Sequence, residues 1–547
     1  MKLTCAQFWN RKLSLSNVGA CLNLILSNAK IFPLEKAEES QFDSVLICGE
    51  NIELIGDLAA CKKACRGKYE LIDLRGKALL PAFIDTHTHF SEYAKQLKQV
   101  DLSGLNSISE IRERLEQFRR ENPILPDWIL GGGWDKNRLD EPEKFNKSIL
   151  DEFFPHTPVA LFSKDYHSRC CNSMALKAAG IKASSPDPSG GKIWRNSLGE
   201  PTGILLETAS ELLDKYIVPL GADETRQCMA TAAAELHKFG LASLHSMEVP
   251  AGAEVLEDFC VKSHALRVCR HFYLDEFEEI TASGKKCGEG GKWYRLGGLK
   301  LFADGALGSQ TAAMFEEYPH SGGNRGILRH SEDELITLIE KAAQAGFSTS
   351  VHAIGDRAVF ITINAFQKTK GVDLPLPQRI EHVQSIRAED IPLLKKSGVF
   401  CAVQPVHLAN DIDLIQNHWP QTQHQAYNFR CLLDAGIPLG FGSDSPIESI
   451  NPFLGIYSAV TRKKELDPKQ EAWHPQERIS VWEALQGYTL GAAAASSEQN
   501  IKGSISPGKL ADLIVIEDFT KLPEEYWLEA RSLLTIVGGE ILWRDGI

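Results

Sequence analysis

Short apolar segments recur along the middle of the chain, and several are followed by segments with helical periodicity. The clearest helix is predicted over Ser331–Ala345, where Ser331 and Glu334 form a capping box and Gly346 ends the pattern. Eight apolar segments read as buried strands: 82–89, 241–247, 267–274, 298–304, 348–353, 379–383, 399–405 and 438–444. Eight such strands joined by crossover helices predict the α/β class and a (β/α)8 TIM barrel.

Both ends of the chain have the pattern of β-strands. Strand-like segments lie at 22–28, 44–56 and 69–74, and again at 513–516 and 534–543. Isolated hairpins are marginally stable, so the two groups predict one small composite β-sandwich domain built from both termini. We assign residues 22–81 plus 500–547 to it, and residues 1–21 to an N-terminal extension.

The gap between the first two strands is anomalous. The first strand candidate ends at residue 89 and the second begins at residue 241, a stretch far longer than one crossover helix. Within the barrel domain, 82–499, we therefore predict an inserted subdomain over about 101–238. An insertion after strand 1 starts at the carboxyl-terminal rim of a barrel, which is where active sites lie. We therefore expect the insertion to act as a lid or to determine specificity.

Composition and charge narrow the function classes. The chain is 43% hydrophobic, and 59 Lys and Arg against 72 Asp and Glu give a net charge of −13. Nucleic acid and anionic membranes need a positive surface, so neither is expected as a partner. No apolar run approaches the roughly 18 residues of a transmembrane span. The 13 cysteines form no C-x-x-C pair, and we expect reduced thiols and a cytoplasmic location.

The end of the first strand carries a pair of histidines. His87 and His89 are two residues apart, so on a strand both side chains point to one face. Two neutral imidazoles that converge are a natural start for a Zn²⁺ site, although a lone His-x-His also occurs by chance.

Other chemically active residues end later strand candidates. His352, His382 and Asp444 lie where a barrel brings strand ends together, and Lys300 lies inside an apolar strand. A buried lysine is unfavourable without a partner or a modification. One histidine on an apolar strand is usually a core residue, but a set in this order favours a shared site.

At this point the sequence resembles the amidohydrolase superfamily, and within it the YtcJ-like branch of amidohydrolase family 3, allied to the D-aminoacylases. The resemblance covers about residues 22–547. It is carried by the segments Leu80–His89, Gly131–Asp135, Lys300–Gly305, His352–Asp356, Arg379–His382, Gly442–Pro446 and Gly503–Leu513.

The resemblance implies a site of six residues around one or two divalent metals, expected to be zinc. Carried over by motif, these ligands are His87, His89, Lys300, His352, His382 and Asp444. Lys300 would be N-carboxylated in the two-metal form, while a single-metal form with Lys300 as a hydrogen-bond donor stays open. We expect Asp444 to move the proton of the attacking water, and His352 or His382 to stabilise the oxyanion.

Candidate substrate-binding residues are less constrained. They are His167, Asn172, Gln310 and Arg462. The expected function is metal-dependent hydrolysis of a C–N bond, an amide or cyclic amide other than a peptide bond, in a small molecule. Two alternatives stay open: another electrophile (lactone, carbamate, phosphoester, or a ring that is deaminated) and a non-catalytic regulatory role on the same scaffold. The expected partner is the substrate, and a homodimer is left open.

Overall fold

The computed structural model describes residues 23–136, 138–164, 168–369 and 371–547, which form two compact units. The larger unit contains the chain up to Tyr93 together with Met229–Ile547, and the smaller contains Ala94–Cys228. In the described part of the chain, no helix is long and apolar enough to cross a membrane.

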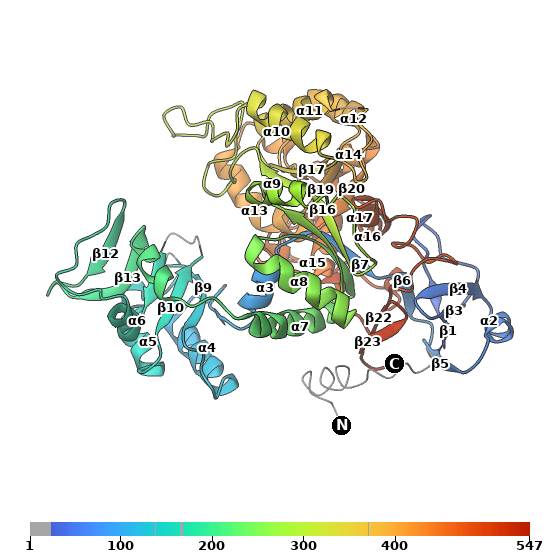
Figure 1. Cartoon of the computed structure of the whole chain (residues 1–547), viewed down its shortest axis with the longest axis horizontal. Coiled ribbons are helices and arrows are strands. Elements are labelled where there is room, and N and C mark those ends of the chain that lie inside the picture. The colour runs from blue at the N-terminus through green and yellow to red at the C-terminus, as the bar shows by residue number, and fades with distance from the viewer. Residues whose placement is uncertain (1–22, 137, 165–167, 370) are drawn as a thin grey trace. The chain divides into compact units, whose positions relative to one another are not determined.

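The larger unit is built on eight parallel strands, each hydrogen-bonded to the next (Figure 1). They are β7 (Phe83–Thr88), β14 (Leu241–Met247), β15 (Arg267–Phe272), β16 (Tyr294–Phe302), β17 (Thr349–Ala353), β18 (Arg379–His382), β19 (Phe400–Val403) and β20 (Leu439–Phe441). A parallel bridge from Thr88 to Ser445 joins the last strand's extension to β7. The predicted TIM barrel is confirmed.

Helices follow the strands around the barrel. They are α8 (Pro250–Ser263), α9 (Phe277–Ala282), α10 (Glu332–Gln344), α11 (Asp356–Lys368), α12 (Ile391–Ser397), α13 (Pro405–His418), α14 (Phe429–Asp434), α15 (Pro452–Thr461), α16 (Val481–Gly487) and α17 (Leu490–Ala494). The capping box of Ser331 and Glu334 starts α10 as predicted, because each side chain binds the other's backbone N–H.

The two ends of the chain form one β-sandwich. One sheet has the order β4 (Asn51–Gly56), β3 (Ser44–Cys48), β1 (Asn23–Ser27), β5 (Tyr69–Asp73). The other has the order β2 (Lys30–Ile31), β6 (Ala78–Pro81), β21 (Leu513–Ile516), β22 (Leu534–Val537), β23 (Glu540–Arg544). β6 and β21 are antiparallel neighbours, with Leu80 opposite Ile514. Leu26 and Leu513 lie in one core, so the composite domain is confirmed.

The smaller unit is an insertion that follows β7 and the helix α3 (Phe90–Gln96). Its sheet has the order β12 (Gly191–Arg195), β13 (Pro201–Glu207), β11 (Ser168–Cys171), β10 (Val159–Ser163), β9 (Ile129–Trp134), β8 (Val100–Asp101). Its helices are α4 (Ile108–Glu121), α5 (Lys147–Phe153) and α6 (Ser173–Ala178), and α7 (Ala222–Lys238) leads into β14. The compact unit spans 94–228, compared with the expected 101–238.

Candidate metal centre

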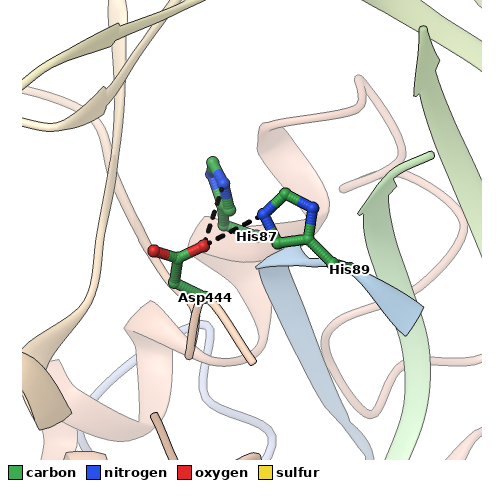
Figure 2. A group of neighbouring side chains, drawn as sticks. All are labelled: His87, His89 and Asp444. Atoms are coloured by element: carbon green, nitrogen blue, oxygen red, sulfur yellow. Dashed lines mark ion pairs between the residues drawn. The ribbon is translucent and has the colours of Figure 1, made fainter. Parts of the chain in front are cut away.

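Three side chains meet at one point, two from the first strand of the barrel, β7, and its end, and one from the segment after the last strand, β20. His87 is the second-last residue of β7, His89 directly follows β7, and Asp444 lies three residues after β20. His87 Nε2 is 3.4 Å and His89 Nε2 is 3.3 Å from the same Asp444 atom, Oδ1. Figure 2 shows both rings turned toward the carboxylate. The backbone fixes this contact, because Asp444 N–H donates to His87 O at 2.7 Å. Within the described chain, this trio could hold a metal ion.

Hydrogen bonds hold both imidazoles in the form that binds metals. His87 Nδ1 is 2.6 Å from Glu381 Oε2, and His89 Nδ1 is 3.1 Å from the carbonyl oxygen of Met247. Both partners accept, so each Nδ1 carries the proton and each Nε2 presents a lone pair. Burial, followed by the charge of Lys300, lowers the pKa of His87 to about 4, which keeps its ring neutral at pH 7.

Glu381 is in turn held by a buried arginine. Arg379 Nε donates to Glu381 Oε1 at 2.9 Å, and Arg379 Nη2 donates to Thr86 O at 2.7 Å. Burial opposes ionisation of Glu381, but the charge of Arg379 and the hydrogen bond from His87 outweigh it and hold its pKa well below the usual range. A chain of charge-assisted bonds thus runs from Arg379 to His87.

His352 and His382 lie next to this trio. Their ring centroids are 4.5 Å apart, and the His382 ring is 4.9 Å from that of His87. His352 Nε2 donates to Gly305 O at 2.9 Å, and His382 Nδ1 donates to Gln404 Oε1 at 2.8 Å. The remaining ring nitrogens then carry lone pairs. These tautomers favour a role as metal ligands, and the expected oxyanion role stays a prediction.

Lys300 is buried within the same group of side chains, with 2% of its surface exposed. Its Nζ lies 5.2 Å from the centre of the Phe302 ring. Burial lowers the pKa of Lys300 to about 8, and the charges of Glu381 and Asp444 limit this shift. The structure therefore brings all six sequence-predicted residues into one region at the carboxyl ends of the strands.

Three residues at the site had no assigned role from sequence. Glu381 orients His87, Gln404 orients His382, and His407 Nε2 lies 3.8 Å from Asp444 Oδ2. Gln404 directly follows β19, and a polar residue beside a predicted strand end is the signal that could have found it.

Two of the predicted substrate-binding residues form hydrogen bonds with other residues of the chain. Asn172 is fully buried at the start of α6, where its Oδ1 accepts from Val159 and Ala175 and its Nδ2 donates to two carbonyls. Its amide is thus used in folding the insertion. Gln310 is half-buried after β16, with its Nε2 3.4 Å from His418 Nδ1.

The other two candidates are Arg462 and His167. Arg462 has 0% of its surface exposed and donates from Nε to Trp473 O and from Nη1 to Tyr427 O. These bonds hold the end of α15. His167 lies outside the described residues. A substrate-binding role for all four candidates stays a prediction.

The sequence pattern of the amidohydrolase family matches residues 70–543. The chain belongs to this family. Putative amidohydrolase YtcJ of Bacillus subtilis is 31% identical to this amidohydrolase, over 87% of the chain and 90% of the relative. N-substituted formamide deformylase of Arthrobacter pascens is 26% identical, over 90% and 93%. The resemblance inferred from the motifs is confirmed.

A solved structure supports the same assignment. The crystal structure of an uncharacterized metal-dependent hydrolase from Pyrococcus furiosus superposes on this amidohydrolase with a TM-score of 0.74 and 26% identity. The match covers 90% of this chain and 99% of that chain. Family and structure together make this amidohydrolase a metal-dependent hydrolase.

Proposed function

We propose that this amidohydrolase hydrolyses a carbon–nitrogen bond, in an amide or cyclic amide, of a small molecule. The observation that carries the proposal is the convergence of His87 Nε2 and His89 Nε2 on Asp444 Oδ1, with both Nδ1 atoms already hydrogen-bonded. The name of the relative from Arthrobacter pascens, a deformylase of N-substituted formamides, supports a C–N bond as the target.

The donor set fits a divalent metal, with zinc as the best match. Two neutral imidazole nitrogens and a carboxylate oxygen are the ligands found in catalytic zinc sites. When bound, the metal supplies a water whose pKa falls from 15.7 toward about 7, so that hydroxide forms at neutral pH. The proposal includes a second metal ion only if Lys300 is N-carboxylated. The lowered pKa of the Lys300 amine leaves a fraction of it neutral, and the neutral amine can react with CO2.

The chain's own residues supply proton transfer. Asp444 Oδ1 faces the two histidines, which leaves Oδ2 on the other side of the carboxylate. Oδ2 takes the proton of the attacking water and returns it to the leaving nitrogen. Burial opposes ionisation of Asp444, but its close contacts with His89 and His87 hold its pKa well below the usual range, so it begins as a base.

An aromatic pair beside the site favours a substrate with an apolar group. Tyr273 follows β15 and Phe302 ends β16, and their rings stack at 6.1 Å with an interplanar angle of 2°. Phe302 also lies 5.3 Å from the His352 ring. Both aromatic residues are half-buried, so part of each remains open to a ligand.

Metal analysis and a substrate panel test the proposal. We expect one or two divalent ions per chain, and turnover of N-substituted formamides, N-acyl amino acids or hydantoins. Turnover restricted to lactones or phosphoesters would favour the alternative electrophiles. Purified protein that binds no divalent ion and turns over nothing would favour a non-catalytic role.

We also propose a cytoplasmic location, which rests on the pattern of cysteines in the sequence. A small molecule is the proposed partner, and light scattering of the purified chain distinguishes a monomer from a homodimer.

A further inference from the structure

His407 is a buried histidine with an unused nitrogen at the centre of the proposed site. It lies in the first turn of α13 and is 8% exposed. Among the described residues, its Nε2 has no hydrogen-bond partner. Its distance of 3.8 Å from Asp444 Oδ2 is too long for a hydrogen bond. Buried polar atoms in folded proteins are almost always paired, so this nitrogen points to a missing partner.

The position of His407 places that partner beside the proton-carrying oxygen. Asp444 Oδ1 is engaged with His87 and His89, whereas Oδ2 faces His407. To receive a proton from Asp444 Oδ2, the leaving nitrogen of the substrate must come within hydrogen-bond distance of Oδ2. The same nitrogen then lies within reach of His407 Nε2.

We propose that His407 Nε2 accepts a hydrogen bond from the N–H group of the scissile bond, which makes this residue a determinant of specificity. The inference rests on the proposed C–N hydrolysis and names its substrate class: secondary amides and cyclic amides whose scissile nitrogen bears hydrogen. Hydroxide adds to the carbonyl carbon, the C–N bond breaks, and the proton from Asp444 Oδ2 goes to the nitrogen lone pair. Throughout, the hydrogen that the nitrogen already carries stays on the nitrogen and remains hydrogen-bonded to His407 Nε2.

A purely structural role predicts different behaviour. Pro405, Val406 and Leu408 beside His407 are buried apolar residues, and a packing residue among them needs no acceptor atom. Loss of such a residue would affect all substrates alike. Loss of an acceptor affects only substrates that bring a donor to it.

Three matched probes separate the two roles. N-(2-phenylethyl)formamide, its N-methyl derivative and 2-phenylethyl formate share their acyl and phenylethyl groups and differ at the scissile atom. Formate release is measured with the metal-loaded full chain. We expect wild-type kcat/KM for the secondary amide to exceed that for the N-methyl amide by at least about tenfold.

Two variants give the decisive comparison. In His407→Leu the ratio of kcat/KM for the secondary amide to that for the formate ester falls at least about tenfold. His407→Gln, which keeps an acceptor at similar reach, restores most of the ratio. The inhibition constant of the product, 2-phenylethylamine, rises in His407→Leu and changes little in His407→Gln, which gives a readout independent of turnover.

Metal content and thermal unfolding are measured on each variant as controls. An unchanged amide-to-ester ratio in His407→Leu, or an equal loss in both variants, overturns the role of His407 and leaves the proposed function intact. If wild type releases formate from the ester alone, the proposed C–N hydrolysis fails instead. Release from none of the three probes, together with no turnover of N-acyl amino acids or hydantoins, contradicts both proposals.

Discussion

His87 Nδ1 lies 2.6 Å from Glu381 Oε2, and both side chains are buried, with 1% and 0% of their surface exposed. A hydrogen bond this well shielded from water fixes the tautomer and the tilt of the ring. The geometry of the first candidate ligand therefore depends on a residue that would not itself touch the metal.

Glu381→Gln tests this dependence. We expect the affinity for Zn²⁺, measured by competition with a chelator, to fall about 10- to 100-fold, because the amide no longer provides a charged acceptor for His87 Nδ1. Glu389→Gln, at a side chain that is 70% exposed, is the matched control and should bind Zn²⁺ normally. Equal affinities in the two variants would contradict the orienting role.

Asp444→Asn tests proton transfer. Asparagine keeps an oxygen for the metal but cannot take a proton, so we expect metal content to be retained while kcat falls by about 10²- to 10⁴-fold. Inductively coupled plasma analysis and steady-state kinetics measure the two quantities. Near-normal kcat in this variant would refute the assignment.

The metal-free protein should show a pH dependence that comes from His87. Its pKa falls from 6.5 to about 4 on folding, so the unfolded chain binds more protons between these values and stability rises with pH across that window. The contribution of His87 is present above pH 6.5 and is lost as the pH falls toward 4.

The difference in free energy of unfolding between wild type and His87→Gln isolates this contribution. Asp85 and Asp304, whose pKa values burial raises to about 7, act with the opposite sign and are common to both proteins. We expect the difference to grow by about 3 kcal/mol from pH 4 to pH 6.5. A difference that stays flat over this range would show that His87 is not buried neutral.

Lys300 should respond to bicarbonate. With a pKa of about 8, roughly a tenth of the amine is neutral at pH 7 and free to react with CO2. We expect wild type in bicarbonate to bind two Zn²⁺ and Lys300→Met to bind one, whereas the exposed Lys36→Met behaves as wild type. The same stoichiometry in all three would count against carboxylation.

Asn172→Ala distinguishes a capping role from substrate binding. Loss of the cap of α6 and of its two carbonyl partners should destabilise the insertion by at least about 1 kcal/mol, measured by hydrogen exchange. We expect kcat/KM of Asn172→Ala to stay within about twofold of wild type, because the Asn172 amide is used in the hydrogen bonds of the insertion. Gln117→Ala, at an exposed position, is the surface control. A selective loss of kcat/KM without destabilisation would restore the substrate role.

The barrel and the His87–His89 pair could be predicted because both follow from local rules. Apolar strand segments of the right length recur, and residues two apart on β7 share a face. The same rule fails at the end of β18, where adjacent Glu381 and His382 both reach the site. His382 has φ of +77°, which breaks strand alternation and turns its side chain inward.

His407 was missed for a different reason. It lies on a helix rather than at a strand end, and its approach to Asp444 depends on where the first turn of α13 lies relative to the segment after β20. His407 and Asp444 are 37 residues apart in the sequence, and the periodicity of neither segment indicates how close their side chains lie in space. Such contacts require the three-dimensional arrangement.

The antiparallel pairing of β6 with β21 joins Leu80 to Ile514. On the ribosome, the amino-terminal half of this sandwich is made long before its partner strands exist. The early strands therefore keep their apolar faces exposed until β21 and β22 have been synthesised. Removal of β21–β23 would leave the apolar faces of β1, β3 and β6 without their partner strands, so burial of the first strands depends on segments that are far away in the sequence.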